Sequence, residues 1–178
     1  MEEKGFINID KVVSQLDVKS GMTVADFGAG HGFFSVAFAK SAGPSGKIFA
    51  IDILPQSLEA VRSRARLDGL FIIKTIESDL ERPRGSTLDD GICDLVFIAN
   101  VLFQVKDKNG LINEARRILK PNGELAVIEW KPYIGLGPQK NLRLSEEELK
   151  TLIDANGFGE SKTLDAGSHH FGYIFKKI

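Results

Sequence analysis

The sequence lacks several features that mark large classes of protein. It has a single cysteine, Cys93, so it cannot form an internal disulfide or supply a cysteine-rich zinc cluster. No apolar run approaches the roughly 18 residues that span a membrane, and the N-terminus lacks the basic start and apolar core of a signal peptide. With 23 Lys and Arg against 24 Asp and Glu, no overall basic field attracts nucleic acid or anionic lipid. These absences predict a soluble, cytoplasmic protein and disfavour membrane and nucleic-acid partners.

The amino-acid composition is typical of a single globular domain. The chain has 178 residues, of which 43% are hydrophobic and 26% charged. A chain of about this length forms one domain that buries about 70% of its unfolded surface. We therefore expect a single domain over 1–178. Residues 1–21 are predicted to cover the core and to include a short helix capped by Asn8, and 22–178 form the core itself.

Short apolar segments alternate with segments of helical periodicity along most of the chain. The predicted buried strands are 22–27, 47–53, 70–76, 94–99 and 124–130. The predicted helices cover 33–41 and 55–66, a segment capped by Asp107, and a segment that begins with a capping box of Ser145 and Glu148. Strands that are apolar throughout and separated by helices favour a parallel sheet covered on both faces.

The end of the chain changes character. Segments 160–165 and 169–175 flank the short sequence Ala166-Gly167-Ser168, so they are close enough to pair as an antiparallel hairpin. The expected fold class is therefore α/β. It is a Rossmann-like, seven-stranded, mostly parallel sheet with helices on both faces and a C-terminal antiparallel hairpin.

The most informative segment joins the first strand to the next helix. It reads Val24-Ala25-Asp26-Phe27-Gly28-Ala29-Gly30-His31-Gly32, an acid followed by three alternate glycines. Glycine has no Cβ, so this backbone can turn sharply and lie against a ligand near the helix N-terminus. A nucleotide-type site is therefore predicted. Counted from Gly28, the third small position of a dinucleotide fingerprint is Phe33, which is too bulky for close packing beside a pyrophosphate, so NAD is disfavoured.

Two further acids follow later strands. Asp52 lies 20 residues after Gly32, where its carboxylate can accept hydrogen bonds from two neighbouring ribose hydroxyls. Asp79 follows the third predicted strand. Open α/β sheets bind ligands at the carboxyl ends of their strands, so we expect Asp26, Asp52 and Asp79 to line one site.

These segments resemble the class I S-adenosylmethionine (SAM) dependent methyltransferases. The pattern Asp26-x-Gly28-x-Gly30-x-Gly32 resembles the first motif of that family, and the likeness continues in 94–103, 117–124 and 171–176. It covers about 8–178 and is similar to the small methyltransferases that include the ubiquinone and menaquinone C-methyltransferases. The resemblance implies SAM as the cofactor and a methyl acceptor as the partner. The residues themselves predict no metal.

The resemblance also implies which residues hold the cofactor. In that family the first acid faces the methionine end, the glycines approach the cofactor, and the acid after the third strand meets the adenine amino group while the next backbone N–H meets a ring nitrogen. The predicted cofactor-binding set is Asp26, Gly28, Ala29, Gly30, Gly32, Asp52, Ile53, Asp79, Leu80 and Asn100.

The predicted catalytic residues follow the fourth and fifth strands. Methyl transfer from a sulfonium gains most from orientation in a dry site, so a dedicated base is not required. The candidates for positioning the acceptor are Asn100, Gln104 and Tyr133, with Glu129, Trp130 and Lys131 beside them. The long loop 131–144 contains glycines and prolines and is predicted to bend over the acceptor as a flap.

The sequence does not identify the methyl acceptor. A small molecule is slightly favoured, and a protein lysine or an RNA is the alternative because the short segment before the first strand would leave the site poorly covered. The sequence at 100–103 is not Asn-Pro-Pro-Tyr, which argues against the amino-methyltransferases that use that run.

Neighbouring His169 and His170 point to opposite faces of a strand, so they do not predict a shared metal. A catalytically silent SAM-binding regulatory module is the alternative from a different class. The sequence indicates no oligomeric state.

Overall fold

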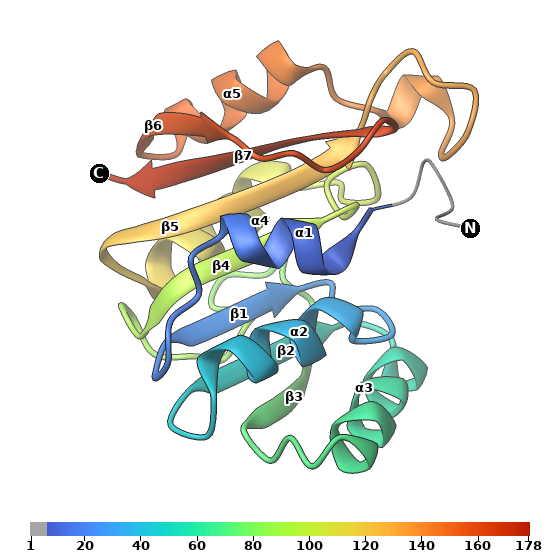
Figure 1. Ribbon diagram of the computed structural model, residues 1–178. Helices are drawn as coiled ribbons and strands as arrows, with labels where there is room; N and C mark the ends of the chain where they lie inside the picture. The colour runs from blue at the N-terminus through green and yellow to red at the C-terminus, as the bar shows by residue number, and fades with distance from the viewer. Residues whose placement is uncertain (1–6) are drawn as a thin grey trace.

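The computed structural model describes residues 7–178 and contains one sheet in the order β3-β2-β1-β4-β5-β7-β6 (Figure 1). The strands are β1 (Thr23–Phe27), β2 (Lys47–Asp52), β3 (Ile73–Glu77), β4 (Cys93–Ala99), β5 (Leu119–Trp130), β6 (Phe158–Thr163) and β7 (His170–Lys177). Strands β1 to β5 are parallel, and β7 lies antiparallel between β5 and β6. The predicted fold class is confirmed.

The helices cover both faces of this sheet. They are α1 (Ile9–Gln15), α2 (Phe33–Ala42), α3 (Pro55–Leu67), α4 (Lys108–Ile118) and α5 (Glu146–Ala155), with a short 3-10 turn η1 (Lys140–Leu142). Apolar residues of α1 and α2 pack on one face, and those of α4 and α5 pack on the other. Because both faces are buried, strands such as β4 are apolar at nearly every position.

The predicted helix starts are confirmed where a side chain caps the backbone. Asn8 accepts a hydrogen bond from the amide of Lys11 at 2.9 Å, and Asp107 accepts one from Gly110 at 2.9 Å. Ser145 and Glu148 form the predicted capping box. The helix α1 belongs to the predicted covering segment 1–21, of which 1–6 lie outside the described residues.

Some strand ends differ from the prediction. The third strand begins at Ile73, because the amide of Leu70 donates to the carbonyl of Ala65 and completes the end of α3. The fifth strand begins at Leu119, because the pairing with β4 continues on both sides of a register shift that absorbs the turn at Asn122. These local hydrogen bonds are not visible in hydrophobic patterning.

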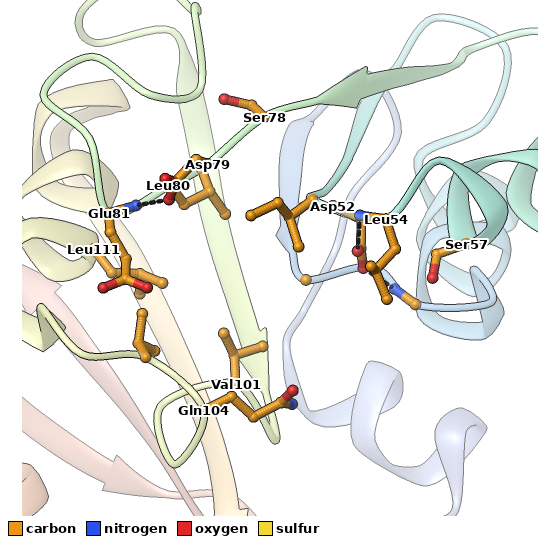
Figure 2. A pocket seen from close by; sticks show the side chains of 14 residues that line it. Asp52, Leu54, Ser57, Ser78, Asp79, Leu80, Glu81, Val101, Gln104 and Leu111 are labelled. Atoms are coloured by element: carbon orange, nitrogen blue, oxygen red, sulfur yellow. Dashed lines mark hydrogen bonds between the residues drawn. The ribbon is translucent and has the colours of Figure 1, made fainter.

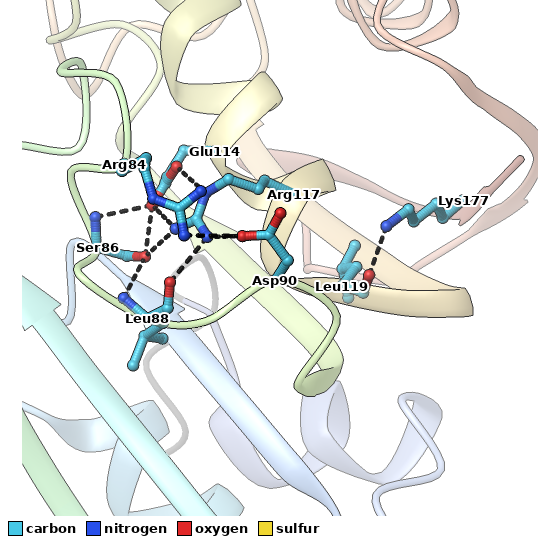
Figure 3. Close-up of polar contacts among 8 residues, drawn as sticks. All are labelled: Arg84, Ser86, Leu88, Asp90, Glu114, Arg117, Leu119 and Lys177. Carbon is cyan, nitrogen blue, oxygen red and sulfur yellow. Dashed lines mark hydrogen bonds and ion pairs between the residues drawn. The ribbon is translucent and has the colours of Figure 1, made fainter.

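The long crossover between β3 and β4 is held against α4 by a polar network (Figure 3). Arg117 donates to Glu114 at 2.7 Å and to Asp90 at 2.6 Å, and buried Ser86 donates to Glu114. The Arg117 guanidinium holds the pKa of Asp90 below its ordinary value. The hydroxyl of Ser78, next to Asp79, donates to the carbonyl of Gly85, which ties the start of this crossover to the segment that the network holds.

Two findings bear on the sequence-based exclusions. Within residues 7–178 no helix is both long and apolar enough to cross a membrane. Cys93 is buried in β4, and its burial raises the pKa of the thiol to about 12, so the thiol stays protonated at neutral pH and packs as a small apolar side chain.

Candidate active site

A cleft of about 410 Å³ opens at the carboxyl ends of the central strands, a size typical of small-molecule sites. Asp52 and Leu54 form one wall and Asp79 and Leu80 the opposite wall, as Figure 2 shows. Of the predicted site residues, those lining the cleft are Gly28, Gly30, Asp52, Ile53, Asp79, Leu80 and Gln104. The predicted residues Asp26, Ala29, Gly32, Asn100 and Tyr133 are not part of its lining.

The glycine loop forms the floor of the cleft. The amides of Gly28 and Ala29 both donate to the carbonyl of Ile51, at 2.8 and 3.0 Å, which fixes the loop to β2. A Cβ on Gly28 would lie 2.5 Å from Cγ2 of Val101. At Gly30 the backbone has φ +52, and a Cβ would meet no protein atom within 4 Å. Because Gly30 lines the cleft, a side chain there would enter the space that a ligand needs.

The close packing of the next helix depends on Gly32 rather than on residue 33. A Cβ on Gly32 would lie 2.8 Å from Cγ2 of Val61 in α3. Phe33 is 51% exposed, and the guanidinium of Arg64 lies 3.9 Å from its ring centroid. The argument against NAD assumed that Phe33 occupies the close contact between the glycine loop and its neighbours. In the structure that contact is made by Gly32 against Val61, and Phe33 points away from it.

Asp52 ends β2 and binds the glycine loop. Its Oδ2 accepts the amide of Gly30 at 2.8 Å, and its Oδ1 accepts the amide of Leu54 at 2.9 Å. Each carboxylate oxygen has a second lone pair, so both can still accept a hydroxyl from a ligand. The same carboxylate thus shapes the cleft and offers two acceptors to it.

Asp79 lies on the opposite wall. Its Oδ1 accepts the amide of Glu81 at 3.1 Å, and its Oδ2 accepts Nε of Arg82 at 3.1 Å. Both groups orient the carboxylate, and Arg82 is largely exposed, so this ion pair stabilises the fold only slightly. The side chain of Leu80 beside it supplies an apolar surface that faces Leu54 across the cleft (Figure 2).

Asp26 is buried beneath the cleft. Its Oδ2 accepts a hydrogen bond from the Ser35 hydroxyl at 2.6 Å. Burial raises the pKa of Asp26 from 3.8 to about 7, the Ser35 hydrogen bond lowers it by less, and the charge of Asp52 raises it further. A carboxyl with this pKa is partly ionised near neutral pH, and a nearby cation favours its ionised form.

Glu129 is a second buried carboxyl, at the end of β5. It is 1% exposed, and its Oε1 accepts the amide of Leu102 at 2.7 Å. Burial raises its pKa from 4.5 to about 7, and hydrogen bonds from the amides of Leu102, Val101 and Trp130 lower it by less. Glu129 therefore ties the loop after β4 to β5 and positions Val101 and Gln104 rather than facing the cleft.

Asn100 follows β4 in the left-handed region, with φ +58. Its amide donates to the carbonyl of Ile128 at 2.9 Å, and its own carbonyl accepts Nε2 of Gln104 at 2.8 Å. Its carboxamide points to His170, whose Nε2 lies 3.3 Å from Nδ2 of Asn100. The sequence singled out Asn100 and Gln104, and the structure brings them together. It considered His170 only as a metal ligand and missed this contact, since the two residues are 70 positions apart.

The loop 131–144 is held from within by one arginine. The guanidinium of Arg143 donates to the carbonyls of Lys131, Ile134, Leu136 and Pro138, at 2.6 to 2.9 Å. A guanidinium has enough donors to bind four carbonyls at once. The loop predicted to bend as a flap is therefore folded around the Arg143 side chain, which hydrogen-bonds to its backbone. Tyr133 is 72% exposed on this loop, outside the cleft.

The donors in this site are not those of a metal centre. Among residues 7–178, no group of three or more His, Cys, Asp or Glu side chains is placed to hold an ion. Asp52 at the end of β2 and Asp79 after β3 instead line a cleft with a glycine floor, and Asp26 of β1 lies outside that lining.

This combination of sheet order, glycine loop and acids at the ends of β2 and β3 is typical of open α/β proteins that bind a ligand at the carboxyl ends of their strands. Residues 18–177 match the family described as a methyltransferase domain, and the chain belongs to that family.

Individual relatives agree with this assignment. A ubiquinone/menaquinone biosynthesis C-methyltransferase of Cupriavidus metallidurans is 34% identical over 124 residues, which are 67% of this chain and 49% of that protein. One from Bordetella avium is 36% identical over 118 residues, 66% of this chain and 44% of that protein. The chain spans about half the length of these curated relatives. A SAM-dependent methyltransferase of Aquifex aeolicus superposes with a TM-score of 0.88 at 26% identity, covering 97% of this chain and 91% of that one.

Proposed function

We propose that this protein is a SAM-dependent methyltransferase that methylates a small-molecule acceptor. The observation that carries the proposal is the cleft at the carboxyl ends of the strands, where Asp52 and Asp79 face each other above a glycine floor that is open at Gly30. Bound SAM would supply a methyl group on a sulfonium, ready for in-line displacement by a nucleophile.

The residues present fit such a cofactor. Asp52 offers two carboxylate oxygens to the ribose hydroxyls, and Asp79 with the adjacent backbone of Leu80 offers an acceptor and a donor to the adenine edge. Ile53 is 59% exposed at the mouth of the cleft and provides an apolar surface for the base. Asp26, with a pKa of about 7, can take the negative charge that stabilises the positively charged methionine end.

The acceptor would be positioned by groups that follow β4. Gln104 lines the cleft and is oriented by its hydrogen bond to Asn100, which places a polar side chain next to the cofactor space. Tyr133 is exposed on the adjoining loop and stays a predicted acceptor contact. Orientation in a site shielded from water lowers the barrier without a dedicated base.

A small molecule is favoured over a protein lysine or an RNA. The relatives described above act, by their names, in ubiquinone and menaquinone biosynthesis, and the near-neutral charge provides no general attraction for a polyanion. Incubation with methyl-labelled SAM and cell extract, followed by separation by size and by protease and nuclease sensitivity, tests this. We expect label in the small-molecule fraction. Label only in protein or RNA would change the acceptor class, and SAM binding without transfer would indicate a silent regulatory module.

Gly30→Ala should weaken SAM binding at least tenfold, because the new Cβ would enter the cleft and disturb the close approach of the ligand. Gly69→Ala is a matched control, since Gly69 has φ +66 and a Cβ there would also meet nothing within 4 Å. Both variants should lose about 1 kcal/mol of stability from left-handed strain. Calorimetric titration with SAM measures the difference, and equal affinities for the two variants would remove Gly30 from the site.

Arg143→Lys should loosen the 131–144 loop, since an ammonium cannot bind four carbonyls in the geometry of a guanidinium. We expect faster amide hydrogen exchange in this loop and about tenfold slower methyl transfer, with SAM affinity within a few-fold of the wild type. Arg62→Lys, which affects contacts with Glu59 and Thr75, serves as the control. Unchanged exchange in Arg143→Lys would show that the loop does not depend on the guanidinium.

A further inference from the structure

The crossover from β3 to β4 folds back on one wall of the cleft at Gly85. The amide of Arg82 donates to the carbonyl of Asp79 at 3.3 Å, and the amide of Gly85 donates to the carbonyl of Arg82 at 2.9 Å. The hydroxyl of Ser78 donates to the carbonyl of Gly85. Successive turns therefore bring the backbone of Gly85 against that of Asp79, which lines the cleft.

This packing leaves no room for a side chain at Gly85. The residue is buried, and a Cβ there would overlap the carbonyl oxygen of Asp79 and lie 2.9 Å from that of Arg82. Its φ is not in the left-handed region, so steric contact and not backbone conformation requires the glycine. Gly85 is not part of the cleft lining, so its effect on a ligand has to pass through Asp79 and the residue that follows.

Residues on either side of Gly85 adopt strained backbone conformations. Arg84 has φ +56 and Thr87 has φ +59, which is a rare outlier for a β-branched residue. The network of Ser86, Glu114 and Arg117 holds this segment against α4 (Figure 3). Strain of this kind persists where the surrounding structure maintains it, and it is concentrated at functional sites. It therefore indicates that the path of this segment serves a function.

The carbonyl that Gly85 covers belongs to the same peptide group as the amide of Leu80. That peptide bond is trans, so the group is planar and its N–H points opposite to its C=O. With the carbonyl held against Gly85, the N–H is turned to the other side, where Leu80 lines the cleft. Within residues 7–178 the amide of Leu80 has no hydrogen-bond acceptor, so it is available to a ligand.

We propose that Gly85 is a positioning residue for the base of the cofactor. Its missing side chain lets the crossover hold the Asp79–Leu80 peptide group so that the Leu80 amide donates to N1 of adenine. N1 is next to the carbon that bears the amino group, which the Asp79 carboxylate accepts. This inference rests on the proposed function and adds to it a residue outside the cleft that determines recognition of the base.

Two deaza analogues of S-adenosylhomocysteine, the demethylated cofactor, test this in the complete protein. The 1-deaza analogue has CH in place of N1 and cannot accept the Leu80 amide, whereas the 7-deaza analogue keeps N1 and is the matched control probe. For the wild type we expect calorimetric titration to show about tenfold weaker binding of the 1-deaza analogue than of S-adenosylhomocysteine. The 7-deaza analogue should bind within about threefold of S-adenosylhomocysteine.

Gly85→Ala should bind S-adenosylhomocysteine about tenfold less tightly than the wild type does, because the new Cβ displaces the Asp79 carbonyl and turns the Leu80 amide away. It should bind the 1-deaza analogue about as tightly as the wild type does, since that analogue does not use the amide. General destabilisation would weaken both ligands equally, so this difference isolates positioning. Gly46→Ala is the matched control, because a Cβ there would lie 3.0 Å from the carbonyl oxygen of Met22, and it should change neither affinity.

Ser78→Ala provides a second measurement that does not depend on Gly85→Ala folding. It removes the hydroxyl that holds the Gly85 carbonyl and adds no atom. We expect about threefold weaker binding of S-adenosylhomocysteine and a smaller loss for the 1-deaza analogue.

The outcomes separate this inference from the proposed function. If S-adenosylhomocysteine fails to bind the wild type, the proposed function is wrong and this inference falls with it. If it binds and the 1-deaza analogue binds as tightly, or both analogues bind equally weakly, the Leu80 amide does not recognise N1 and the inference is overturned. If the folded variant, Gly85→Ala or Ser78→Ala, weakens S-adenosylhomocysteine and the 1-deaza analogue equally or weakens neither, Gly85 does not position the base, which also overturns it.

Discussion

Asp52→Ala is expected to weaken SAM binding about 100-fold. Hydrogen bonds to a charged group contribute about 1.5–3 kcal/mol, which alone corresponds to roughly a 10- to 150-fold change. The structure adds a second cause. The carboxylate also accepts the amides of Gly30 and Leu54, so its removal releases the glycine loop that forms the floor of the cleft. Both effects act on the same ligand, so the loss should lie in the upper part of that range.

A matched acid separates ligand binding from fold stability. Asp94 lies near the start of β4, at the edge of the sheet opposite the cleft. It accepts hydrogen bonds from the amide of Thr23 at 2.8 Å and from Nζ of Lys120 at 2.7 Å. Asp94→Ala should therefore cost stability comparable to that lost in Asp52→Ala, about 1–3 kcal/mol, without changing the dissociation constant for SAM. Calorimetric titration and urea unfolding of both variants test this. A folded Asp52→Ala protein with wild-type affinity would remove Asp52 from the cofactor site.

Asp26→Asn is expected to make the protein more stable above neutral pH. The folded-state pKa of Asp26 is about 7, raised from 3.8 by burial. A carboxyl whose pKa is raised on folding contributes most stability below about pH 4, and that contribution is lost as the pH rises through about 7. Each pKa unit corresponds to about 1.4 kcal/mol. The wild type should therefore lose up to about 4 kcal/mol from this group over that range, and the uncharged Asn should not.

The difference in unfolding free energy between Asp26→Asn and the wild type should thus be small near pH 4 and largest near pH 8. Asn retains an oxygen that can accept the hydrogen bond from the Ser35 hydroxyl, so the packing is preserved. Asp165→Asn is a control of opposite sign, because a hydrogen bond from Lys11 lowers the pKa of Asp165 and its stabilising effect grows as the pH rises. Urea unfolding at pH 4, 6 and 8 gives all three curves.

The same substitution should weaken SAM binding, because Asn cannot take the negative charge that stabilises the cationic methionine end. A variant that is more stable at pH 8 and binds SAM less tightly would show that Asp26 is retained for function at a cost in stability. A variant whose stability parallels that of the wild type from pH 4 to 8 would show that the burial of Asp26 does not raise its pKa in solution.

Much of the cleft was predictable because it is built from strand ends. Asp52 and Asp79 follow strands that the apolar pattern identifies, and parallel strands bring their carboxyl ends to one edge whatever the remaining packing. Helix caps such as Ser145 with Glu148 were predictable for a similar reason, since the interacting groups lie within one turn of each other. The C-terminal hairpin followed from a short connection between two strands.

The contacts that follow β4 and β5 were not predictable in this way. Asn100 meets His170 only because β7 pairs with β5 in the register that sets His170 opposite Trp130. In strands buried on both faces the side chains do not alternate between apolar and polar, so the sequence carries little information about register. The hydrogen bonds of Arg143 to the 131–144 loop could not be predicted either, because its partners are backbone carbonyls, which every residue possesses.

By itself the sequence determined the order of strands and helices, the glycine loop and the two acids that line the cleft, since all of these depend on groups near one another along the chain or on the common edge of a parallel sheet. The tertiary structure alone decided which carboxyls are buried, how the loop after β5 is held, and that an amide and an imidazole 70 residues apart lie in contact. Those features depend on long-range register and on exclusion of water, which only the assembled fold establishes.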